Sequence, residues 1–223
     1  MDRLYTSPMN LQALVFDAYG TLYDVHAVIR RCDGFWPGRG TALSQLWRSK
    51  QLEYTWQRSL MRRYLPFSAV TREALAYACD ALKLVLDASR ANALMDEYLK
   101  LAAYPEVPAA LQRLAARKLA ILTNGSPDMI EPLVKHSGLK FDAVLSVDEL
   151  EIFKPAPEVY QLAVDRLGVA KEHIGFVSSN CWDALGAKSY GFSVFWINRT
   201  GAPVDRLGFQ PDRIVSGLNE VLL

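Results

Sequence analysis

Short apolar runs alternate with amphipathic segments along most of the chain. The first run, residues 13–16, is too short and too uniformly apolar for a half-exposed strand, so it predicts a buried strand of a parallel sheet. Later strands are expected at residues 119–123, 143–146, 174–177 and 193–197, with an edge strand at 213–215. This alternation predicts an α/β fold, a doubly wound parallel sheet with helices on both faces.

Helical periodicity fills the spaces between these later strands. The expected helices cover residues 109–116, 127–137, 158–167 and 183–190. Gly138, Gly168 and Gly191 follow three of these helices, where glycine is typical of a C-cap. These helices are therefore indicated both by their apolar periodicity and by a glycine at the carboxyl end of three of them.

A long helical stretch interrupts the alternation after the first strand. Residues 42–64 contain neither proline nor glycine and carry a wide apolar face, which predicts a long, mostly buried helix. Residues 72–84 and 88–102 continue the helical pattern, with Thr71 and Asp87 as expected N-caps. We expect a helical cap domain over residues 25–103, inserted into a core domain of residues 1–24 and 104–223.

Polar residues follow several of the expected strands. They are Asp17, Thr123, Asn124, Ser178, Asn180 and Asp183. Because the carboxyl ends of parallel strands meet at one edge of a sheet, we expect these side chains to converge. The helical insertion leaves after the first strand and returns before the second, so it should lie over that edge as a lid. Taken alone, Asp17 has an alternative interpretation as an aspartate that only hydrogen-bonds its turn.

Composition indicates an ordinary globular protein. The 223 residues are 51% hydrophobic with a formal net charge of +1, which gives no electrostatic signal for nucleic-acid binding. The cluster Arg58, Arg62 and Arg63 is interpreted as the solvated face of a helix. Three widely spaced cysteines predict no disulfide framework, and no segment is apolar enough to span a membrane. We expect a soluble, cytoplasmic protein.

Four segments resemble, in order, the motifs of the haloacid dehalogenase superfamily, whose members attack substrate with an aspartate. They are residues 14–24 (LVFDAYGTLYD), 122–126 (LTNGS), 153–155 (FKP) and 177–183 (VSSNCWD). Residues 35–40 and 46–56 resemble the L-2-haloacid dehalogenases in particular. The resemblance covers almost the whole chain. It implies a Rossmann-type core of the haloacid dehalogenase kind with an inserted helical cap.

Position 19 separates two activities within that superfamily. Its phosphatases carry a second aspartate two residues after the nucleophile and bind Mg²⁺ through the first and fourth motifs. This chain has Tyr19 there and only Asp183 in the fourth motif, which is too few oxygen ligands for a well-held Mg²⁺. The expectation is therefore no metal and no cofactor. The resemblance places Lys154 beside Asp17 as the aligning cation.

The resemblance implies a covalent reaction on a small 2-haloacid. Asp17 would attack C2 of an S-2-haloalkanoic acid, and water would cleave the aspartyl ester to give an R-2-hydroxy acid. Arg48 and Asn124 are implied to bind the departing halide. Thr21 and Ser178 are implied to orient carboxylates, and Asn180 and Asp183 to position water. The implied substrate pocket comprises Tyr19, Leu52, Phe67, Thr123, Asn124, Tyr160 and Trp182. Tyr160 could instead orient Lys154 or only pack, and Tyr19 and Trp182 could be ordinary core residues.

Two positions depart from the family pattern. Thr123 stands where the family commonly has serine, and Ser49 stands where it often has glutamine. The first change adds a methyl group and the second removes a longer side chain from the expected pocket. Both leave the preferred chain length and halogen open.

Two other functions are alternatives to dehalogenation. A magnesium-dependent phosphatase of the same superfamily is disfavoured by Tyr19. A binding module without catalysis is disfavoured because it has no need for Asp17, Arg48 and Lys154 together. Homodimers are common in the family, and the aromatic-rich segment 42–64 leaves a homodimer and a monomer as open alternatives.

Overall fold

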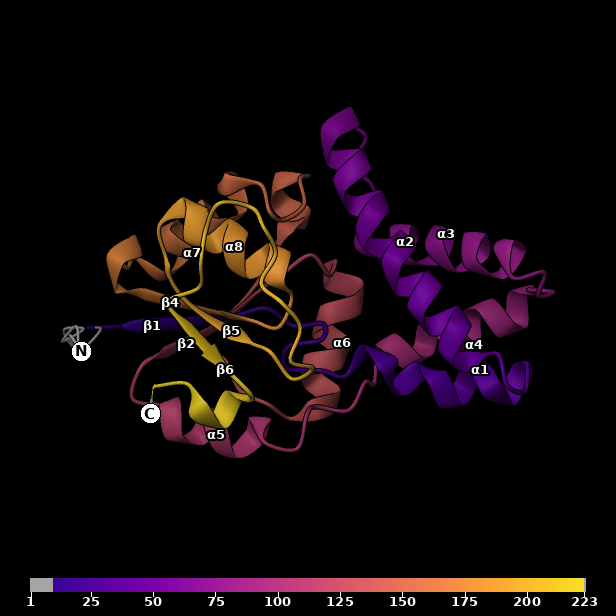
Figure 1. The fold of residues 1–223 in the computed structure, drawn as a ribbon, viewed down its shortest axis with the longest axis horizontal. Helices are drawn as coiled ribbons and strands as arrows, with labels where there is room; N and C mark the ends of the chain where they lie inside the picture. Colours follow the sequence, from indigo (N-terminus) through magenta and orange to yellow (C-terminus); the bar gives the residue numbers. More distant parts are fainter. Residues whose placement is uncertain (1–9, 223) are drawn as a thin grey trace.

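A six-stranded parallel sheet forms the centre of the larger part of the molecule (Figure 1). The computed structural model describes residues 10–222. The strand order is β3-β2-β1-β4-β5-β6, and every neighbouring pair is parallel. The strands are β1 (Ala13–Phe16), β2 (Lys118–Thr123), β3 (Ala143–Ser146), β4 (Ile174–Ser178), β5 (Ser193–Ile197) and β6 (Arg213–Val215). The predicted fold class and edge strand are confirmed.

The uniformly apolar composition of β1 fits its central position in the sheet. All four of its residues are buried, because β2 and β4 flank it and helices cover the sheet. In the register, Phe16 lies opposite Ile121 of β2 and Val177 of β4. The residues that follow these three strands therefore share one edge of the sheet.

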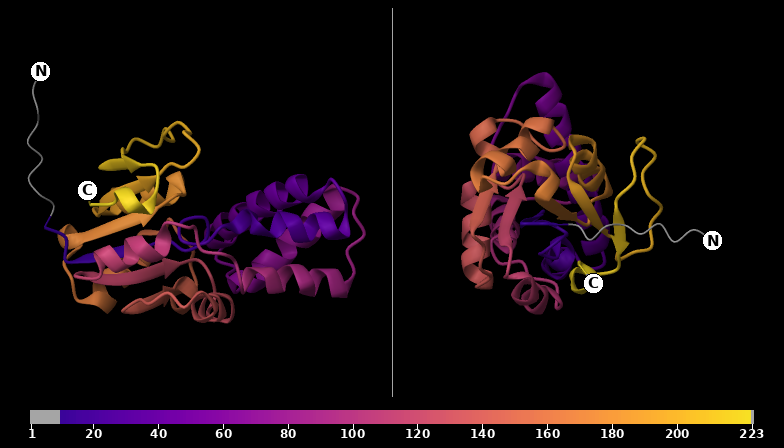
Figure 2. Two further views of the ribbon diagram at one scale, coloured as in Figure 1. Left: turned by 90° about the horizontal axis from the view of Figure 1, so that it is seen from below. Right: turned by 90° about the vertical axis from the view of Figure 1, so that its left-hand side faces the viewer.

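Helices lie on both sides of the sheet (Figure 2). They are α5 (Val107–Leu114), α6 (Pro127–Ser137), α7 (Pro157–Leu167) and α8 (Cys181–Tyr190). Gly138, Gly168 and Gly191 end α6, α7 and α8 in the left-handed conformation, as the sequence predicts.

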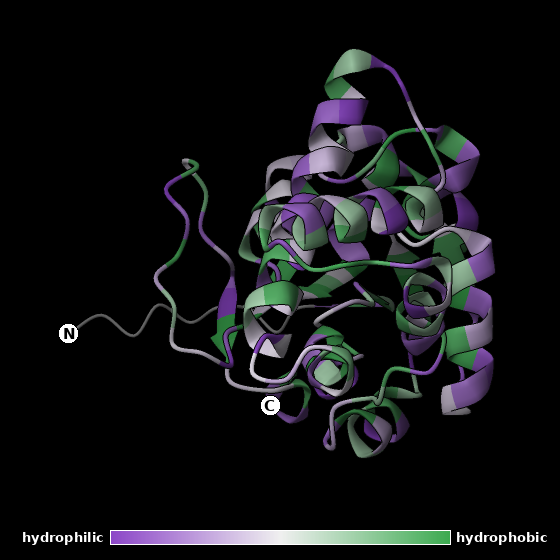
Figure 3. Cartoon of the chain, turned by 90° about the vertical axis from the view of Figure 1, so that its right-hand side faces the viewer, coloured by the Kyte–Doolittle hydropathy of each residue, from purple (hydrophilic) through white to green (hydrophobic). Residues whose placement is uncertain are grey.

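A second group of helices lies between β1 and β2 in the chain and beyond the carboxyl ends of the strands (Figures 1 and 2). They are the short η1 (Val25–Val28), α1 (Ile29–Phe35), α2 (Gly40–Met61), α3 (Phe67–Ala81) and α4 (Ala88–Tyr98). Figure 3 shows hydrophobic and hydrophilic positions mixed along these helices. In α2 the buried residues Leu43, Trp47, Gln51 and Thr55 recur every four positions, so one stripe faces the neighbouring helices. Within residues 10–222, no helix has the length and apolarity needed to cross a membrane.

One predicted cap is wrong. Thr71 lies inside α3, which begins at Phe67, and its hydroxyl donates to the carbonyl of Phe67 at 2.7 Å. A threonine inside a helix can donate its hydroxyl proton to a carbonyl of the preceding turn, so a threonine need not mark a helix start. Asp87 is confirmed as the N-cap of α4, because its side chain accepts from the Arg90 amide at 2.8 Å.

The chain passes between the sheet and the helical insertion at two adjacent places. The amide of Asp24 donates to the carbonyl of Ala102 at 2.9 Å, and the amide of Tyr104 donates to that of Leu22 at 3.0 Å. Tyr23 and Ala103 form an antiparallel bridge between them. The insertion is therefore tied to the sheet by a short paired segment next to the turn that follows β1.

Candidate active site

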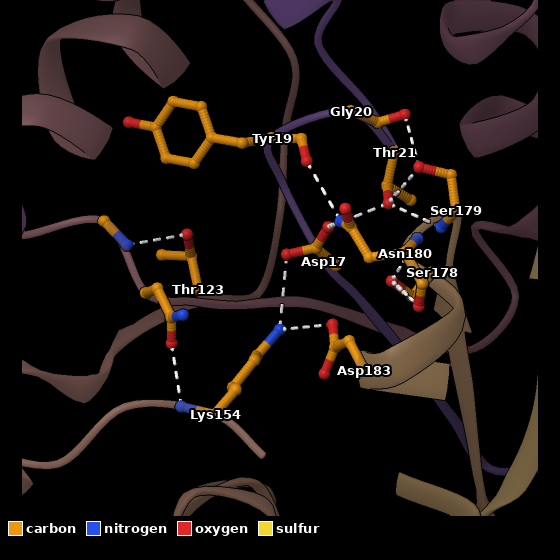
Figure 4. A network of polar contacts seen from close by, with 12 residues as sticks. Asp17, Tyr19, Gly20, Thr21, Thr123, Lys154, Ser178, Ser179, Asn180 and Asp183 are labelled. Atoms are coloured by element: carbon orange, nitrogen blue, oxygen red, sulfur yellow. Dashed lines mark hydrogen bonds and ion pairs between the residues drawn. The ribbon is translucent and has the colours of Figure 1, made fainter. Parts of the chain in front are cut away.

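Asp17 emerges from the end of β1 into a tight turn and is almost fully buried. One carboxylate oxygen, Oδ2, accepts from the Thr21 hydroxyl at 2.9 Å and from the Asn180 amide at 2.8 Å (Figure 4). Gly20 has a φ of 89°, a conformation that favours glycine, and this lets Thr21 fold back toward Asp17. The carboxylate is thus held in one orientation by two donors from different strand ends.

Lys154 bridges the carboxylates of Asp17 and Asp183 (Figure 4). Its Nζ lies 3.3 Å from Asp17 Oδ1 and 2.9 Å from Asp183 Oδ2, and the lysine is only 1% exposed. The hydroxyl of Tyr160 donates to Asp183 Oδ1 at 2.8 Å. Burial raises the pKa of Asp183 to about 6, and the adjacent ammonium opposes that shift. Asp183 therefore orients Lys154 toward Asp17.

This donor set does not fit a divalent metal ion. Within residues 10–222, no group of three or more His, Cys, Asp or Glu side chains could hold one. Asp17 and Asp183 already share the Lys154 ammonium, which occupies the space between their carboxylates.

Arg48 reaches the site from α2. Its Nη2 lies 3.4 Å from the carbonyl oxygen of Tyr19 and 3.5 Å from Asn180 Oδ1. A pocket of about 450 Å³ opens beside it, and Leu52, Asn180 and Trp182 also contribute to the lining. The helical insertion thus brings a guanidinium next to the residue that holds the Asp17 carboxylate.

Thr123 is the last residue of β2 and Asn124 follows it; both are buried. Asn124 Oδ1 accepts from the main-chain amide of Lys154 at 2.9 Å. Because that partner is a donor, the side-chain oxygen must face it and the amide nitrogen points the other way. The Thr123 hydroxyl accepts from the Gly125 amide at 3.0 Å and so orders the turn after the strand.

The expected apolar residues form two groups. Tyr19 packs on Phe67 with ring centroids 5.7 Å apart, and its buried hydroxyl has no hydrogen-bond partner among residues 10–222. Burial raises the pKa of that phenol, so Tyr19 stays neutral. Trp182 lines the pocket with Leu52 and meets Trp56 edge-to-face at 5.4 Å. Tyr19 and Phe67 join the insertion to the turn at residues 17–21, whereas Trp182 and Leu52 line the pocket.

Two expectations about individual side chains need correction. Among residues 10–222, Ser178 orients no carboxylate. Its hydroxyl accepts from the main-chain amide of Asn180 at 3.1 Å, because a short side chain reaches its own turn most easily. Ser49 is exposed on α2, so the absence of glutamine there opens no space beside Asp17 in this arrangement.

Ser179 supports the turn that follows Asp17, a role that its sequence position alone does not predict. Its main-chain amide donates to Thr21 Oγ1 at 2.8 Å, and its hydroxyl donates to the carbonyl of Gly20 at 2.6 Å. Since the Thr21 oxygen accepts from Ser179, its own proton is free for Asp17. The only sequence signal was the position of Ser179 inside a motif.

Arg199 was missed because it follows β5 and belongs to no motif. Its two terminal nitrogens donate to the carbonyls of Gly20 at 3.1 Å and Thr21 at 3.0 Å. The guanidinium also pairs with Glu106 at 2.7 Å and lies 3.7 Å from the Tyr104 ring centroid. Arg199 thereby holds the turn at residues 17–21 against the paired segment that leads to the insertion.

Comparison with known proteins agrees with this geometry. A family model of haloacid dehalogenase-like hydrolases matches residues 11–191, so the chain belongs to that family. It is 50% identical over 216 residues to an (S)-2-haloacid dehalogenase of Pseudomonas sp. (strain YL), covering 95% of this chain and 93% of the relative. The resemblance to the L-2-haloacid dehalogenases is confirmed.

Two further relatives extend the comparison. Haloacetate dehalogenase H-2 of Moraxella sp. (strain B) is 45% identical, over 95% of this chain and 96% of its own. The structure of L-2-haloacid dehalogenase from Xanthobacter autotrophicus with chloropropionic acid covalently bound superimposes with a TM-score of 0.90. That pair is 42% identical and covers 95% of this chain and 97% of the other.

Proposed function

We propose that this protein is an (S)-2-haloacid dehalogenase. It converts short S-2-haloalkanoic acids to R-2-hydroxyalkanoic acids and halide, without a metal or cofactor. The observation that carries this proposal is the buried Asp17 carboxylate, held by Thr21 and Asn180 and paired with the Lys154 ammonium. That arrangement suits a nucleophile that attacks carbon and needs no proton donor for its leaving group.

In the first step Asp17 attacks C2 of the substrate. The new bond joins a carboxylate oxygen to C2, the carbon-halogen bond breaks, and halide departs with the electron pair, inverting C2. Arg48 and the Asn124 amide nitrogen bind the substrate anion and the departing halide. The neighbouring structure with covalently bound chloropropionic acid supports an ester intermediate.

In the second step water attacks the ester carbonyl carbon, Cγ of Asp17. The bond from Cγ to the oxygen attached to C2 breaks, that oxygen takes one proton of the attacking water by way of Asp183, and the hydroxy acid leaves. The other proton of the water is lost to solvent as the Asp17 carboxylate re-forms. Asn180 and Asp183 position the water, and Asp183 accepts its proton, because this buried carboxylate has a raised pKa. C2 is untouched in this step, so the single inversion is retained.

The remaining assignments complete the proposal. Tyr19, Leu52, Phe67 and Trp182 form the apolar wall of the substrate site, and Thr123 shapes its edge. Residues 25–103 act as a cap domain over a core of residues 1–24 and 104–223. Three free cysteines, Cys32, Cys79 and Cys181, are consistent with a reducing cytoplasm. The assembly is either a monomer or a homodimer.

Halide release tests the reaction and its stereochemistry. We expect release from S-2-chloropropionate, little from the R enantiomer, and R-lactate as the product. A parallel assay with p-nitrophenyl phosphate and Mg²⁺ should give no phosphate release. Magnesium-dependent release of phosphate with no halide release would establish the phosphatase alternative instead.

A single turnover in H₂¹⁸O tests the nucleophile. If Asp17 attacks C2, the hydroxyl oxygen of the product comes from its carboxylate, so the first-turnover product is unlabelled and the peptide containing Asp17 gains mass. Direct attack of water on C2 would give the same inversion. In that case the product would be labelled and the peptide unchanged, and the ester mechanism would be wrong.

A further inference from the structure

Gln51 is a fully buried amide one turn after Arg48 on α2. Its side-chain oxygen accepts from Arg48 Nη1 at 2.6 Å, and its nitrogen donates to the Thr71 hydroxyl at 2.7 Å. The residue is 0% exposed. Both ends of the amide are therefore used, one on the arginine and the other on α3.

Thr71, at the other end of the hydrogen-bonded chain from Arg48 through Gln51, lies where α2 packs on α3. The Thr71 hydroxyl donates to the carbonyl of Phe67 at 2.7 Å. The indole nitrogen of Trp47 donates to the carbonyl of Thr71 at 2.8 Å. Because these partners are buried backbone and side-chain groups, the position of Gln51 is determined by the helix pair.

Gln51 restricts a side chain that otherwise has many rotamers. A free arginine samples several orientations, and ordering it costs conformational entropy. With Nη1 bonded to Gln51, the guanidinium turns Nη2 toward Tyr19 O and Asn180 Oδ1. The cation is thus oriented toward the Asp17 site before substrate binds.

The chemical type of the acceptor matters as much as its place. An amide oxygen is neutral, so it orients the guanidinium without cancelling its charge. A glutamate of the same shape would form a buried ion pair with Arg48 and weaken its attraction for an external anion. The pocket beside Arg48 is where such an anion would approach.

We propose that Gln51 is a positioning residue for dehalogenation, which orients Arg48 toward substrate and halide while leaving its charge available to them. This inference rests on the proposed function. It differs from a purely structural role, in which Gln51 would serve only to satisfy Thr71 and the α2-α3 contact.

Gln51→Glu separates charge from shape. We expect a higher KM for S-2-chloropropionate and about tenfold weaker binding of bromide to the free enzyme. A thermal scan reports separately on the lost hydrogen bond from the Gln51 amide to Thr71. Gln45→Glu is the matched control, because Gln45 is exposed on the same helix and its substitution adds the same charge. Unchanged bromide affinity in Gln51→Glu would overturn the proposal.

Gln51→Met, alone and combined with Arg48→Lys, separates positioning from packing. If Gln51 acts through Arg48, Gln51→Met lowers kcat about tenfold alone but has little further effect in the double variant. Independent losses that multiply in the double variant would leave Gln51 with a structural role only. Halide release by the unmodified protein tests the proposed function separately, and bromide titration reports on Arg48 whether or not turnover occurs.

Discussion

At the scale of single residues, the site is a cluster of two buried carboxylates around one buried ammonium. Asp17 and Asp183 share the Lys154 ammonium, and neutral donors from Thr21 and Tyr160 supply further hydrogen bonds. A buried charge is tolerated only when such partners replace water. Even so, burial outweighs the partners of Asp183 and raises its pKa to about 6. Its protonation state is therefore sensitive to acid.

This raised pKa predicts how activity and stability depend on pH. The folded protein binds the Asp183 proton more tightly than the unfolded chain, so the contribution of Asp183 to stability falls as pH rises between 3.8 and about 6. Activity should change in the opposite direction, because in the proposed mechanism ionised Asp183 orients Lys154 and accepts the proton from water. We expect kcat to rise with pH through the same range.

Tyr160→Phe should shift that rise to higher pH. The Tyr160 hydroxyl lowers the pKa of Asp183 by donating to it, so its removal raises that pKa further. The measurement is kcat against pH, with Tyr77→Phe as a control because Tyr77 is exposed on α3. An unshifted profile in Tyr160→Phe would mean that Asp183 does not govern the acidic limb.

At the scale of secondary-structure elements, a glycine in α8 lets α7 come close. A Cβ at Gly186 would lie 2.5 Å from the Tyr160 hydroxyl and 2.6 Å from Pro155 Cβ. Both neighbours belong to residues 154–160, the segment that carries Lys154 and from which Tyr160 donates to Asp183. The absence of a side chain at Gly186 thus allows Tyr160 to reach Asp183.

Gly186→Ala should destabilise the protein although alanine is the better helix former. Helix propensity alone would favour alanine by about 1 kcal/mol, but the clash with Tyr160 should reverse the sign and cost about 1–3 kcal/mol. Gly34→Ala is the matched control, since that exposed helical glycine has no atom within 4 Å of an added Cβ. Denaturant unfolding and kcat check both variants. Equal stabilisation of both would exclude the proposed clash.

At the scale of the whole molecule, distant segments supply the positive charge of the site. Arg48 comes from the helical insertion, and Lys154 comes from the loop before α7. Arg199, after β5, ties the nucleophile turn to the paired segment at Tyr104. The protein thus surrounds Asp17 with its own cations, where a metal-dependent site would need an ion.

Turnover should therefore persist in excess EDTA. The Lys154 ammonium already bonds both buried carboxylates, so chelation removes nothing that the site uses. The measurement is halide release from S-2-chloropropionate with and without EDTA, and a metal-dependent phosphatase assayed alongside confirms that chelation is complete. Loss of activity that Mg²⁺ restores would contradict this expectation.

The local pattern of the sequence determined the elements and their order. The apolar run before Asp17 is β1, and residues 127–137, 143–146 and 193–197 are bounded as predicted. Such assignments succeed because the period of apolar residues and the glycine end signals act over a few residues. Parallel pairing then implied that Asp17, Asn124 and Asp183 would meet at one edge of the sheet.

Only the tertiary structure decided which partner each polar side chain takes. Thr71 was expected to begin a helix and instead anchors Gln51, and Ser178 bonds its own turn while Ser179 supports Thr21. Arg199 carried no local signal, since a solvated arginine and one bound to two carbonyls have the same sequence. Local periodicity reports which side of an element is buried, whereas hydrogen-bond partners depend on atoms that packing brings together from distant parts of the chain.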